Sequence, residues 1–457
     1  MSHIAKTRLT QAQLDAHWMS YTGNRQFKKD PRIISSAAGH YYTDIEGRKI
    51  FDGLSGLWTC GLGHSVPAIN EAVAEQVKTL DYSPAFQFGH EKSFLLAEQI
   101  TQFMPDGLNR IFFTGSGSES VDTALKVARA YWRKKGMGTK TKFIGRAKGY
   151  HGAGISGFSV GGIPANRTLY GQGLESYHLP HTQVPGTEFT KGMSEFGKER
   201  AEDLINLISL HDASNIAAVI VEPMSGSGGV IIPPQGYLKR LREICDQYNI
   251  LLIFDEVITA FGRMGAKTGA EAFGVTPDAI TMAKQVTNGV IPMGAVAFKQ
   301  EIYDTFMDTG GPDYMLEIPH GYTYAAHPIA CAAGLASLEE IKKQGLIERV
   351  KNMSGFWEDS VHQLKGASPI ITDIRNYGFA AGITIAPVDN EPGKRPFQIA
   401  MDMWDKGYYV RYGADTIQLA PPFTTEQSEI DSMMNALGDS IQKLGKVRTS
   451  PLASACG

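Results

Sequence analysis

The middle of the chain alternates short apolar runs with stretches in which apolar residues recur every three or four positions. Runs at 111–113, 217–221 and 250–254 have the length and composition of buried strands. The stretches that follow show helical spacing, with apolar residues at Val121, Ala124, Leu125, Ala128 and Trp132 and again at Leu238, Leu241 and Cys245. This alternation predicts an α/β fold with a mostly parallel sheet, helices on both of its faces, and ligands at the carboxyl ends of its strands.

Composition narrows the class of protein. The 457 residues include 44 Lys and Arg against 47 Asp and Glu, a net charge of −3, which argues against nucleic acid as a main partner. No stretch approaches the roughly 18 apolar residues of a membrane span, and residues 1–14 lack the apolar core of a signal peptide. The four cysteines are far apart in the sequence, which favours a reducing cytoplasm over a disulfide scaffold. Residues 448–457 are small and polar and predict a disordered tail.

Polar groups follow two of the predicted strands. Residues 114–119 (TGSGSE) lie between a strand and a helix, where they either cradle a phosphate or form an ordinary turn with a Ser cap. Asp255 and Glu256 end a buried strand. An acid there either holds a buried cation, such as a protonated pyridine nitrogen, or caps a helix or forms a salt bridge.

Two further residues suggest chemistry. Lys284 ends a short apolar run, where a partly buried amine reacts with carbonyls, although most lysines are solvated. Tyr150, in residues 149–152 (GYHG), either stacks on a cofactor ring or packs in the core. A phosphate cradle, a stacking aromatic, a pyridinium carboxylate and a Schiff-base lysine together describe a pyridoxal-phosphate site.

Two motifs are rejected. Residues 152–157 match GxGxxG, but they follow Gly-Tyr-His rather than a strand and precede Ser, Gly and Pro, so we expect no dinucleotide site. His178 and His181 have a Pro between them and no third ligand nearby, so no metal site is predicted.

Longer strings carry a family resemblance. Residues 254–265 (FDEVITAFGRMG), together with Lys284, resemble the signature of class III aminotransferases, which are fold type I pyridoxal-phosphate-dependent transferases. Residues 14–19, 54–61 and 284–295 are similar to bacterial omega-amino acid:pyruvate aminotransferases, including beta-alanine:pyruvate enzymes. The resemblance runs from about Leu14 to Leu444.

The resemblance implies an architecture and an assembly. It implies a large cofactor-binding domain at 66–334 with a mostly parallel sheet, and a smaller α+β domain built from both termini, 1–65 and 335–457. It also implies a homodimer with active sites at the interface, with a tetramer as the alternative.

The resemblance also implies roles for individual residues. Lys284 and Asp255 would be catalytic, binding the cofactor's aldehyde and its ring nitrogen. The implied cofactor-binding residues are Gly117, Ser118, Tyr150, His151, Glu222, Asp255, Val257, Lys284 and Thr323, the last reaching the phosphate of the neighbouring subunit. The implied substrate-binding residues are Tyr21, Trp58, Phe86, Ser227 and Arg411, with Phe86 coming from the partner chain. Without the resemblance, the aromatic residues could be core residues and Arg411 a solvated one.

The implied reaction is ping-pong transfer of an amino group from an omega-amino acid or amine to pyruvate, giving L-alanine and an aldehyde or ketone. Taurine, GABA or diamine transamination, and a pyridoxal-phosphate-dependent mutase or decarboxylating relative, are the alternatives. A non-catalytic cofactor-binding protein and a nicotinamide-linked dehydrogenase are disfavoured, the first by Lys284 and Asp255. The chain departs from the family pattern at Ala260, where we expect a restricted turn, and at Met264, while Ser227 leaves the pocket size open.

Overall fold

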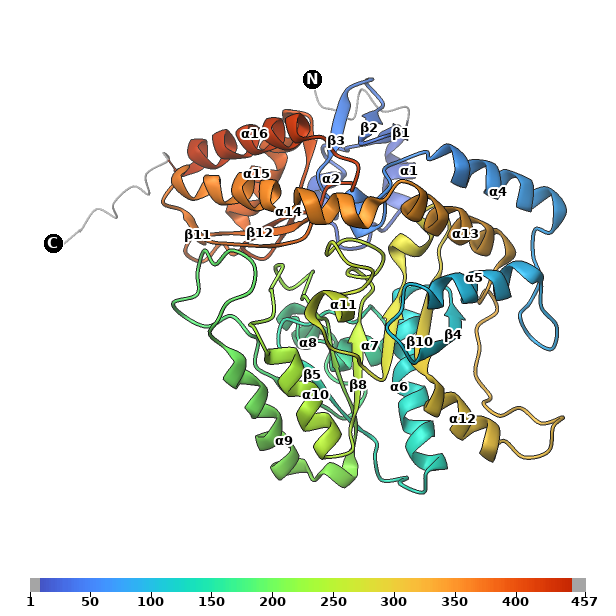
Figure 1. The fold of residues 1–457 in the computed structure, drawn as a ribbon. Helices are drawn as coiled ribbons and strands as arrows, with labels where there is room; N and C mark the ends of the chain where they lie inside the picture. Colours follow the sequence, from blue (N-terminus) through green and yellow to red (C-terminus); the bar gives the residue numbers. More distant parts are fainter. Residues whose placement is uncertain (1–8, 446–457) are drawn as a thin grey trace.

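The computed structural model describes residues 9–445, so the predicted disordered tail lies outside the described residues. Figure 1 shows the arrangement of the elements. The helices are α1 (Gln11–Ala16), α2 (Asn24–Phe27), α3 (Ser55–Trp58), α4 (Pro67–Thr79), α5 (Glu91–Thr101), α6 (Gly117–Lys134), α7 (Ile155–Val160), α8 (Pro164–Tyr170), α9 (Asp203–His211), α10 (Tyr237–Gln247), α11 (Gly269–Phe273), α12 (Gln300–Thr309), α13 (Pro328–Lys343), α14 (Leu346–His362), α15 (Lys394–Asp405) and α16 (Gln427–Gly445). The strands are β1 (Ile34–Ala38), β2 (Tyr41–Asp44), β3 (Lys49–Asp52), β4 (Leu108–Thr114), β5 (Lys142–Arg146), β6 (Ser176–Leu179), β7 (Ile216–Val221), β8 (Leu251–Asp255), β9 (Ala279–Met282), β10 (Gly294–Lys299), β11 (Ile371–Tyr377), β12 (Ala380–Ile385), β13 (Tyr408–Tyr409), β14 (Arg411–Gly413) and β15 (Thr416–Leu419).

The central sheet has seven strands in the order β4-β10-β9-β8-β7-β5-β6. Strands β6, β5, β7, β8 and β9 pair in parallel, whereas β10 runs antiparallel to both of its neighbours. The predicted α/β fold with a mostly parallel sheet is therefore confirmed.

Both faces of this sheet are buried. Every residue of β7 is buried, and from Ala218 onward its side chains alternate between two apolar clusters, with Val219 in one and Ile220 in the other. The predicted stripe of α6 packs in the Ile220 cluster, and that of α10 packs in the Val219 cluster. Burial on both faces explains why the strands read as continuous apolar runs rather than alternating ones.

A smaller region combines the two ends of the described chain. One four-stranded sheet has the order β1-β2-β3-β13, in which β13 runs parallel to β3 with Tyr408 opposite Phe51. The antiparallel sheet β11-β12-β15-β14 lies beside α14, α15 and α16 (Figure 1). Strand pairing thus joins early and late segments, while the domain boundaries at 65/66 and 334/335 stay a prediction.

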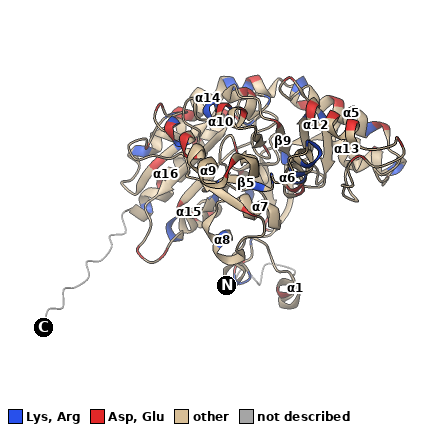
Figure 2. Ribbon diagram, turned by 90° about the horizontal axis from the view of Figure 1, so that it is seen from below, with Lys and Arg blue, Asp and Glu red and all other residues tan. Residues whose placement is uncertain are grey.

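The surface carries both signs of charge. Acidic and basic residues alternate along helices of the face shown in Figure 2, as expected for a chain with a net charge of −3. Within residues 9–445, no helix combines the length and the apolar character that crossing a bilayer requires.

Candidate active site

A cavity of about 1140 Å³ opens where the parallel strands end. Because β5, β7, β8 and β9 run the same way, the turns after them meet at one edge of the sheet, as the sequence predicted. Of the predicted site residues, the cavity wall contains Tyr21, Trp58, Tyr150, Ser227, Lys284 and Arg411.

Lys284 lies two residues past β9, at the first position of a 3₁₀ turn (Lys284–Thr287). Its φ of 50° is in the left-handed region, which is unfavourable for a residue with a side chain. The pKa of Lys284 is lowered to about 8, chiefly by burial, with Arg411 acting in the same direction and Asp255 and Glu222 opposing it. The amine therefore loses its proton far more readily than a surface lysine does.

Asp255 ends β8 and is 5% exposed. Its Oδ2 lies 2.8 Å from His151 Nδ1, and its Oδ1 accepts a hydrogen bond from the backbone N–H of Val257 at 3.2 Å. His151 Nε2 is buried and has no hydrogen-bond partner in the part of the chain that the structure describes. These contacts fix a buried carboxylate near Lys284, where it can hold a cation.

The neighbouring Glu256 points to different partners. Its carboxylate accepts hydrogen bonds from Ala270 N at 2.8 Å, from Thr259 Oγ1 at 2.9 Å and from Gly269 N. Burial raises the pKa of Glu256 to about 7. Glu256 thus stabilises the start of α11, as the capping interpretation expects, while the cation-holding role of Asp255 stays a prediction.

The N-terminus of α6 reaches the same edge. Ser116 caps this helix by accepting a hydrogen bond from Glu119 N at 3.2 Å. A Cβ at Gly117 would lie 3.0 Å from the methyl groups of Val257, so this close approach needs a glycine. Ser118 Oγ accepts a hydrogen bond from Ala153 N at 3.0 Å. A helix start crowded against Val257 fits the predicted phosphate cradle.

Glu222 holds the Tyr150 segment in place. Its two carboxylate oxygens accept hydrogen bonds from Tyr150 N and Gly226 N, both at 2.9 Å, and burial raises its pKa. Burial and the neighbouring Tyr21 raise the pKa of the Tyr150 hydroxyl. Tyr150 and Tyr21 therefore form one aromatic wall of the cavity.

Trp58 and Arg411 come from opposite ends of the chain. Trp58 is 3% exposed, with φ of 64°, and its Nε1 is buried without a hydrogen-bond partner among residues 9–445. The Nε of Arg411, on β14, is likewise buried and unpartnered in that range. Because Arg411 lowers the pKa values of Lys284 and Tyr150, its charge acts on the cavity and suits an anionic substrate group. Ser227 contributes a backbone oxygen, which Gln418 Nε2 holds at 3.1 Å.

Phe86 and Thr323 lie outside the cavity of their own chain. Phe86 is 48% exposed, and its ring occupies the space next to Gly321. Thr323 is exposed, and its carbonyl oxygen accepts a hydrogen bond from Tyr82 Oη at 3.0 Å. The two residues therefore share a surface region in which they are available to a second subunit.

The departures from the family pattern cause no strain. Ala260 is not among the residues with positive φ, and its N–H donates to Glu256 O at 3.1 Å. Phe261 and Gly262 adopt the left-handed conformations of this turn, so the expected restriction at Ala260 was wrong. Met264 is buried in an apolar cluster.

The rejected motifs can also be placed. Helix α7 begins at Ile155, so the GxGxxG segment does open a short helix, contrary to expectation. His178 Nε2 lies 2.8 Å from Gly161 O, whereas His181 lines the cavity. Within the described residues, no cluster of His, Cys, Asp and Glu could hold a metal ion.

Sequence reasoning missed several residues around the site. Arg146 is buried and donates to Glu222 O and Ser225 Oγ, both at 2.7 Å. Gln285 and Asn288 accept hydrogen bonds from the backbone of residues 61–62 and so join the Lys284 turn to the Trp58 segment. Proximity to Lys284 was the only sequence signal for these two, and nothing local marked Arg146.

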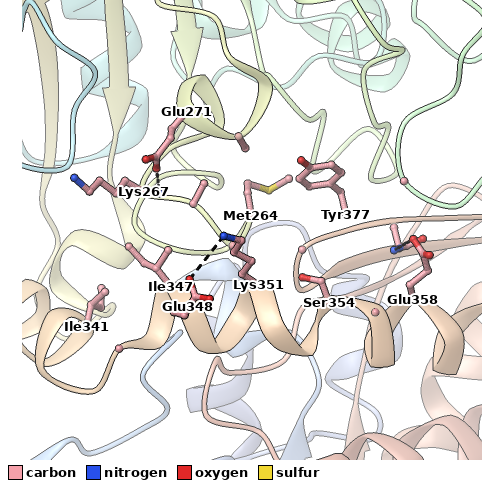
Figure 3. A pocket seen from close by; sticks show the side chains of 18 of the residues that line it. Met264, Lys267, Glu271, Ile341, Ile347, Glu348, Lys351, Ser354, Glu358 and Tyr377 are labelled. Carbon is pink, nitrogen blue, oxygen red and sulfur yellow. Dashed lines mark hydrogen bonds and ion pairs between the residues drawn. The ribbon is translucent and has the colours of Figure 1, made fainter.

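A second cavity, of about 850 Å³, lies between residues 264–267 and α14 (Figure 3). Met264, Lys267, Glu271, Lys351 and Glu358 are part of its wall. It includes none of the predicted site residues.

Comparisons with known proteins agree with the geometry of the first cavity. The sequence pattern of the family described as "Aminotransferase class-III" matches residues 22–441. The chain is 56% identical over 440 residues to a beta-alanine–pyruvate aminotransferase of Pseudomonas aeruginosa, covering 96% of this chain and 98% of that protein. It is 54% identical over 444 residues to an omega-amino acid–pyruvate aminotransferase of Pseudomonas putida, covering 97% and 99%. A solved transaminase from the marine bacterium Virgibacillus superposes with a TM-score of 0.88 at 32% identity, covering 96% and 99%. An amine transaminase from an uncultivated Pseudomonas species, solved with pyridoxal phosphate bound, gives 0.87 at 33% identity, covering 94% and 99%.

Proposed function

Because the chain belongs to the class III aminotransferases, which depend on pyridoxal phosphate, we propose that it transfers an amino group from an omega-amino acid or amine to pyruvate. The observation that carries this proposal is Lys284, with its lowered pKa, beside the buried Asp255 at the edge of the central sheet. The two Pseudomonas relatives described above are named for beta-alanine and for omega-amino acids, each with pyruvate, so taurine, GABA, diamine and mutase chemistry is less well supported.

The residues at this edge fit the cofactor. The start of α6, with Gly117 and Ser118, would hold the phosphate, and Asp255, oriented by His151, would hold the ring nitrogen as a cation. Val257 and Tyr150 would cover the two ring faces. When bound, pyridoxal phosphate supplies a carbonyl carbon that exchanges the amino group and a ring that accepts electrons.

The chain's own residues would move the proton and select the substrates. Lys284 Nζ takes the proton from the donor's amine-bearing carbon, which its lowered pKa permits near neutral pH. Glu222 holds the backbone of the Tyr150 segment and would lie near the cofactor's ring substituents. Arg411 binds the carboxylate of pyruvate, while Trp58, Tyr21 and Ser227 form the walls around the donor's side chain.

We propose that the active form is a homodimer, and a tetramer is the alternative. Large apolar side chains around Phe86 support an interface: Phe88 is 64% exposed, Phe94 71% and Tyr324 67%. Thr323 lies beside them and would reach the phosphate bound by the neighbouring subunit. The cysteines of the described residues are free, in keeping with the cytoplasmic location that we propose.

The test uses purified protein supplied with pyridoxal phosphate. With β-alanine and pyruvate we expect continuous formation of L-alanine, measured by chromatography. With β-alanine alone we expect no more than one carbonyl product per active site, because a ping-pong transfer stops after one half-reaction. Continuous turnover without an acceptor would indicate decarboxylation or a mutase, and no alanine from β-alanine or 1-phenylethylamine would contradict the proposal.

A further inference from the structure

The cavity that contains Lys284 also extends to a group of polar residues that the proposed chemistry does not use: Lys148, His181, Thr182 and Gln183. They lie in the turns after β5 and β6, which are parallel neighbours. Arg146 pairs with Leu179 at the ends of these strands, and Ala147 N donates to Leu179 O at 2.8 Å. Lys148 and His181 each lie two residues beyond that pair, so the topology brings them side by side.

Two polar atoms in this group have nothing to bind. Thr182 is only 4% exposed, and its Oγ1 has no hydrogen-bond partner within residues 9–445. His181 Nδ1 is also buried and unpartnered there. Native structures rarely leave such atoms unsatisfied, so both point to a bound polar group. The Thr182 hydroxyl supplies a donor of the kind an anion requires, while the His181 ring also interacts with the backbone of Gln183.

The cavity wall carries cations as well as the carboxylates of Glu188, Asp373 and Asp415, but none of these carboxylates pairs with Lys148. The ammonium of Lys148 donates to the neutral Gln183 Oε1 at 2.8 Å, and no carboxylate in the described chain lies within ion-pair distance of it. Burial and the nearby Arg375 lower the pKa of Lys148, and Asp373 opposes them. Asp373 already forms an ion pair with Arg375, so Lys148 remains a half-buried cation without a dedicated counter-charge.

The backbone of Lys148 is also held in an unfavourable conformation. Its φ is 63°, a region that favours glycine, yet a lysine is present. Tyr21, Trp58 and Lys284, which line the same cavity, share this property. Ala414 in the same wall also has a positive φ, so these conformations show that the surrounding structure fixes the backbone of the cavity wall, including that of Lys148.

We propose that Lys148, His181 and Thr182 form a second anion subsite, which binds the far acid group of a long omega-amino acid whose amine end reacts at Lys284. This inference rests on the proposed function and extends it to a substrate class. Arg411 would serve pyruvate and short donors such as β-alanine, whereas the second subsite would serve donors with a longer chain between amine and acid. A carboxylate and a sulfonate share the required chemistry.

The test compares two series of donors of equal chain length: omega-amino acids, with an acid at the far end, and n-alkylamines, without one. In Lys148→Met we expect kcat/KM for the acids to fall about tenfold more than for the matched alkylamines, mainly through KM, with a maximum at one chain length. Lys148→Arg should restore most of the preference. Omega-aminosulfonates run in parallel would show which acid group the subsite prefers.

Two further variants complete the design. Thr182→Val removes the hydroxyl and keeps the shape of the side chain. It should reduce the preference for omega-amino acids over alkylamines by a smaller factor than Lys148→Met. This variant also tests the subsite if Lys148→Met fails to fold. Lys142→Met is the matched control, because Lys142 lies on β5 but pairs with Glu175 at 3.1 Å on the surface. It should leave the preference as in the wild type.

The outcomes separate this inference from the proposed function. If the wild type transfers amino groups but Lys148→Met weakens acids and alkylamines equally at every length, the subsite is wrong and the function stands. Inorganic phosphate that inhibits alkylamine turnover as strongly as acid turnover would indicate a site for a free anion and would also overturn it. If the wild type uses no donor at all, the proposed function itself fails.

Discussion

The structure has two large cavities, one of about 1140 Å³ at the carboxyl edge of the central sheet and one of about 850 Å³ beside α14. They differ in whether their polar side chains have hydrogen-bond or ion-pair partners. In the first, burial lowers the pKa of Lys284, and Trp58 Nε1 and Thr182 Oγ1 lack partners among residues 9–445. In the second, Lys342 Nζ donates to Gln102 Oε1 at 2.7 Å, and Lys351 lies 3.9 Å from Glu348 in an exposed ion pair (Figure 3).

The difference shows which property identifies an active site. Volume does not, since both cavities are large enough for a small molecule. Buried groups with shifted pKa values and unsatisfied hydrogen-bond capacity do identify an active site. Such groups destabilise the folded state unless a ligand or a reaction compensates for them. The comparison therefore predicts large effects of mutations in the first cavity and small ones in the second.

The largest effect should come from Lys284→Ala. Loss of the amine removes both the covalent attachment point and the group that moves the proton, so kcat should fall at least about a thousandfold. The measurement is the initial rate of L-alanine formation, with circular dichroism to verify folding. Residual activity within tenfold of the wild type would remove the basis for assigning the site to the first cavity.

Asp255→Asn and Glu256→Gln form a matched pair of neighbours. The first neutralises the carboxylate that would hold the ring nitrogen, and kcat should fall roughly a hundredfold or more. The second changes a carboxyl that burial has already raised to a pKa of about 7, so it should lower the stability of the fold by about 1 kcal/mol and kcat by less than about threefold. The measurements are kcat and thermal unfolding of both variants. Equal losses of kcat would contradict the assignment of a cofactor-binding role to Asp255 and a structural role to Glu256.

Arg411→Met should act on KM. Loss of a hydrogen-bonded charge pair with a carboxylate should raise KM for pyruvate about ten- to a hundredfold. KM for 1-phenylethylamine, which has no carboxylate, should change far less. Steady-state kinetics with both substrates measures the split, and parallel changes would show that Arg411 is a structural residue.

The lowered pKa of Lys284 predicts a pH dependence of cofactor uptake by the apoprotein. Only the neutral amine attacks a carbonyl, so the uptake rate should increase about tenfold per pH unit below pH 7 and level off above about pH 8. A lysine with an ordinary pKa would give a rate that still climbs at pH 10. Stopped-flow absorbance across this range distinguishes the two curves.

The smallest effect should come from the second cavity. Lys351→Met breaks only an exposed ion pair, so stability should change by about 0.5 kcal/mol or less and kcat/KM should stay within twofold of the wild type. Thermal unfolding and initial rates measure both. A larger loss of activity would show that the second cavity is coupled to the first and would break the comparison.

The sequence predicted the elements whose information is local. The runs that became β7 and β8 were recognisable because both of their faces are buried, and Asp255 and Lys284 were predicted as site residues because each ends an apolar run, at β8 and just past β9. Asp255 and Glu256 received two competing interpretations. The contacts of Glu256 with α11 support the capping interpretation for that residue, while the cation-holding role of Asp255 stays a prediction.

The residues that escaped prediction depend on contacts between distant segments. Arg146 reaches the site only through hydrogen bonds to Glu222 O and Ser225 Oγ, and Lys148 and His181 meet only because β5 and β6 pair in parallel. His181 was noticed as half of a possible metal motif, for the wrong reason. A pattern within one segment carries no information about a neighbour that arrives from another.

The pairing of β13 with β3 has a consequence for folding during synthesis on the ribosome. Strand β3 is complete when about 50 residues have been made, but its partner emerges about 350 residues later. At 5–20 residues per second, the interval is on the order of half a minute. Throughout that time one edge of β3 is open to pairing with other chains.

The same delay applies to the cavity. Trp58 and Lys284 emerge from the ribosome well before Arg411. The nascent chain can therefore complete the central sheet, which would bind the cofactor, before the part of the cavity wall that would bind the substrate carboxylate has been made. A ribosome stalled within the last fifty codons would therefore hold a chain with most of a central sheet, an open strand edge and half a pocket. During synthesis, the segment that pairs with β3 is therefore among the last that can join the fold.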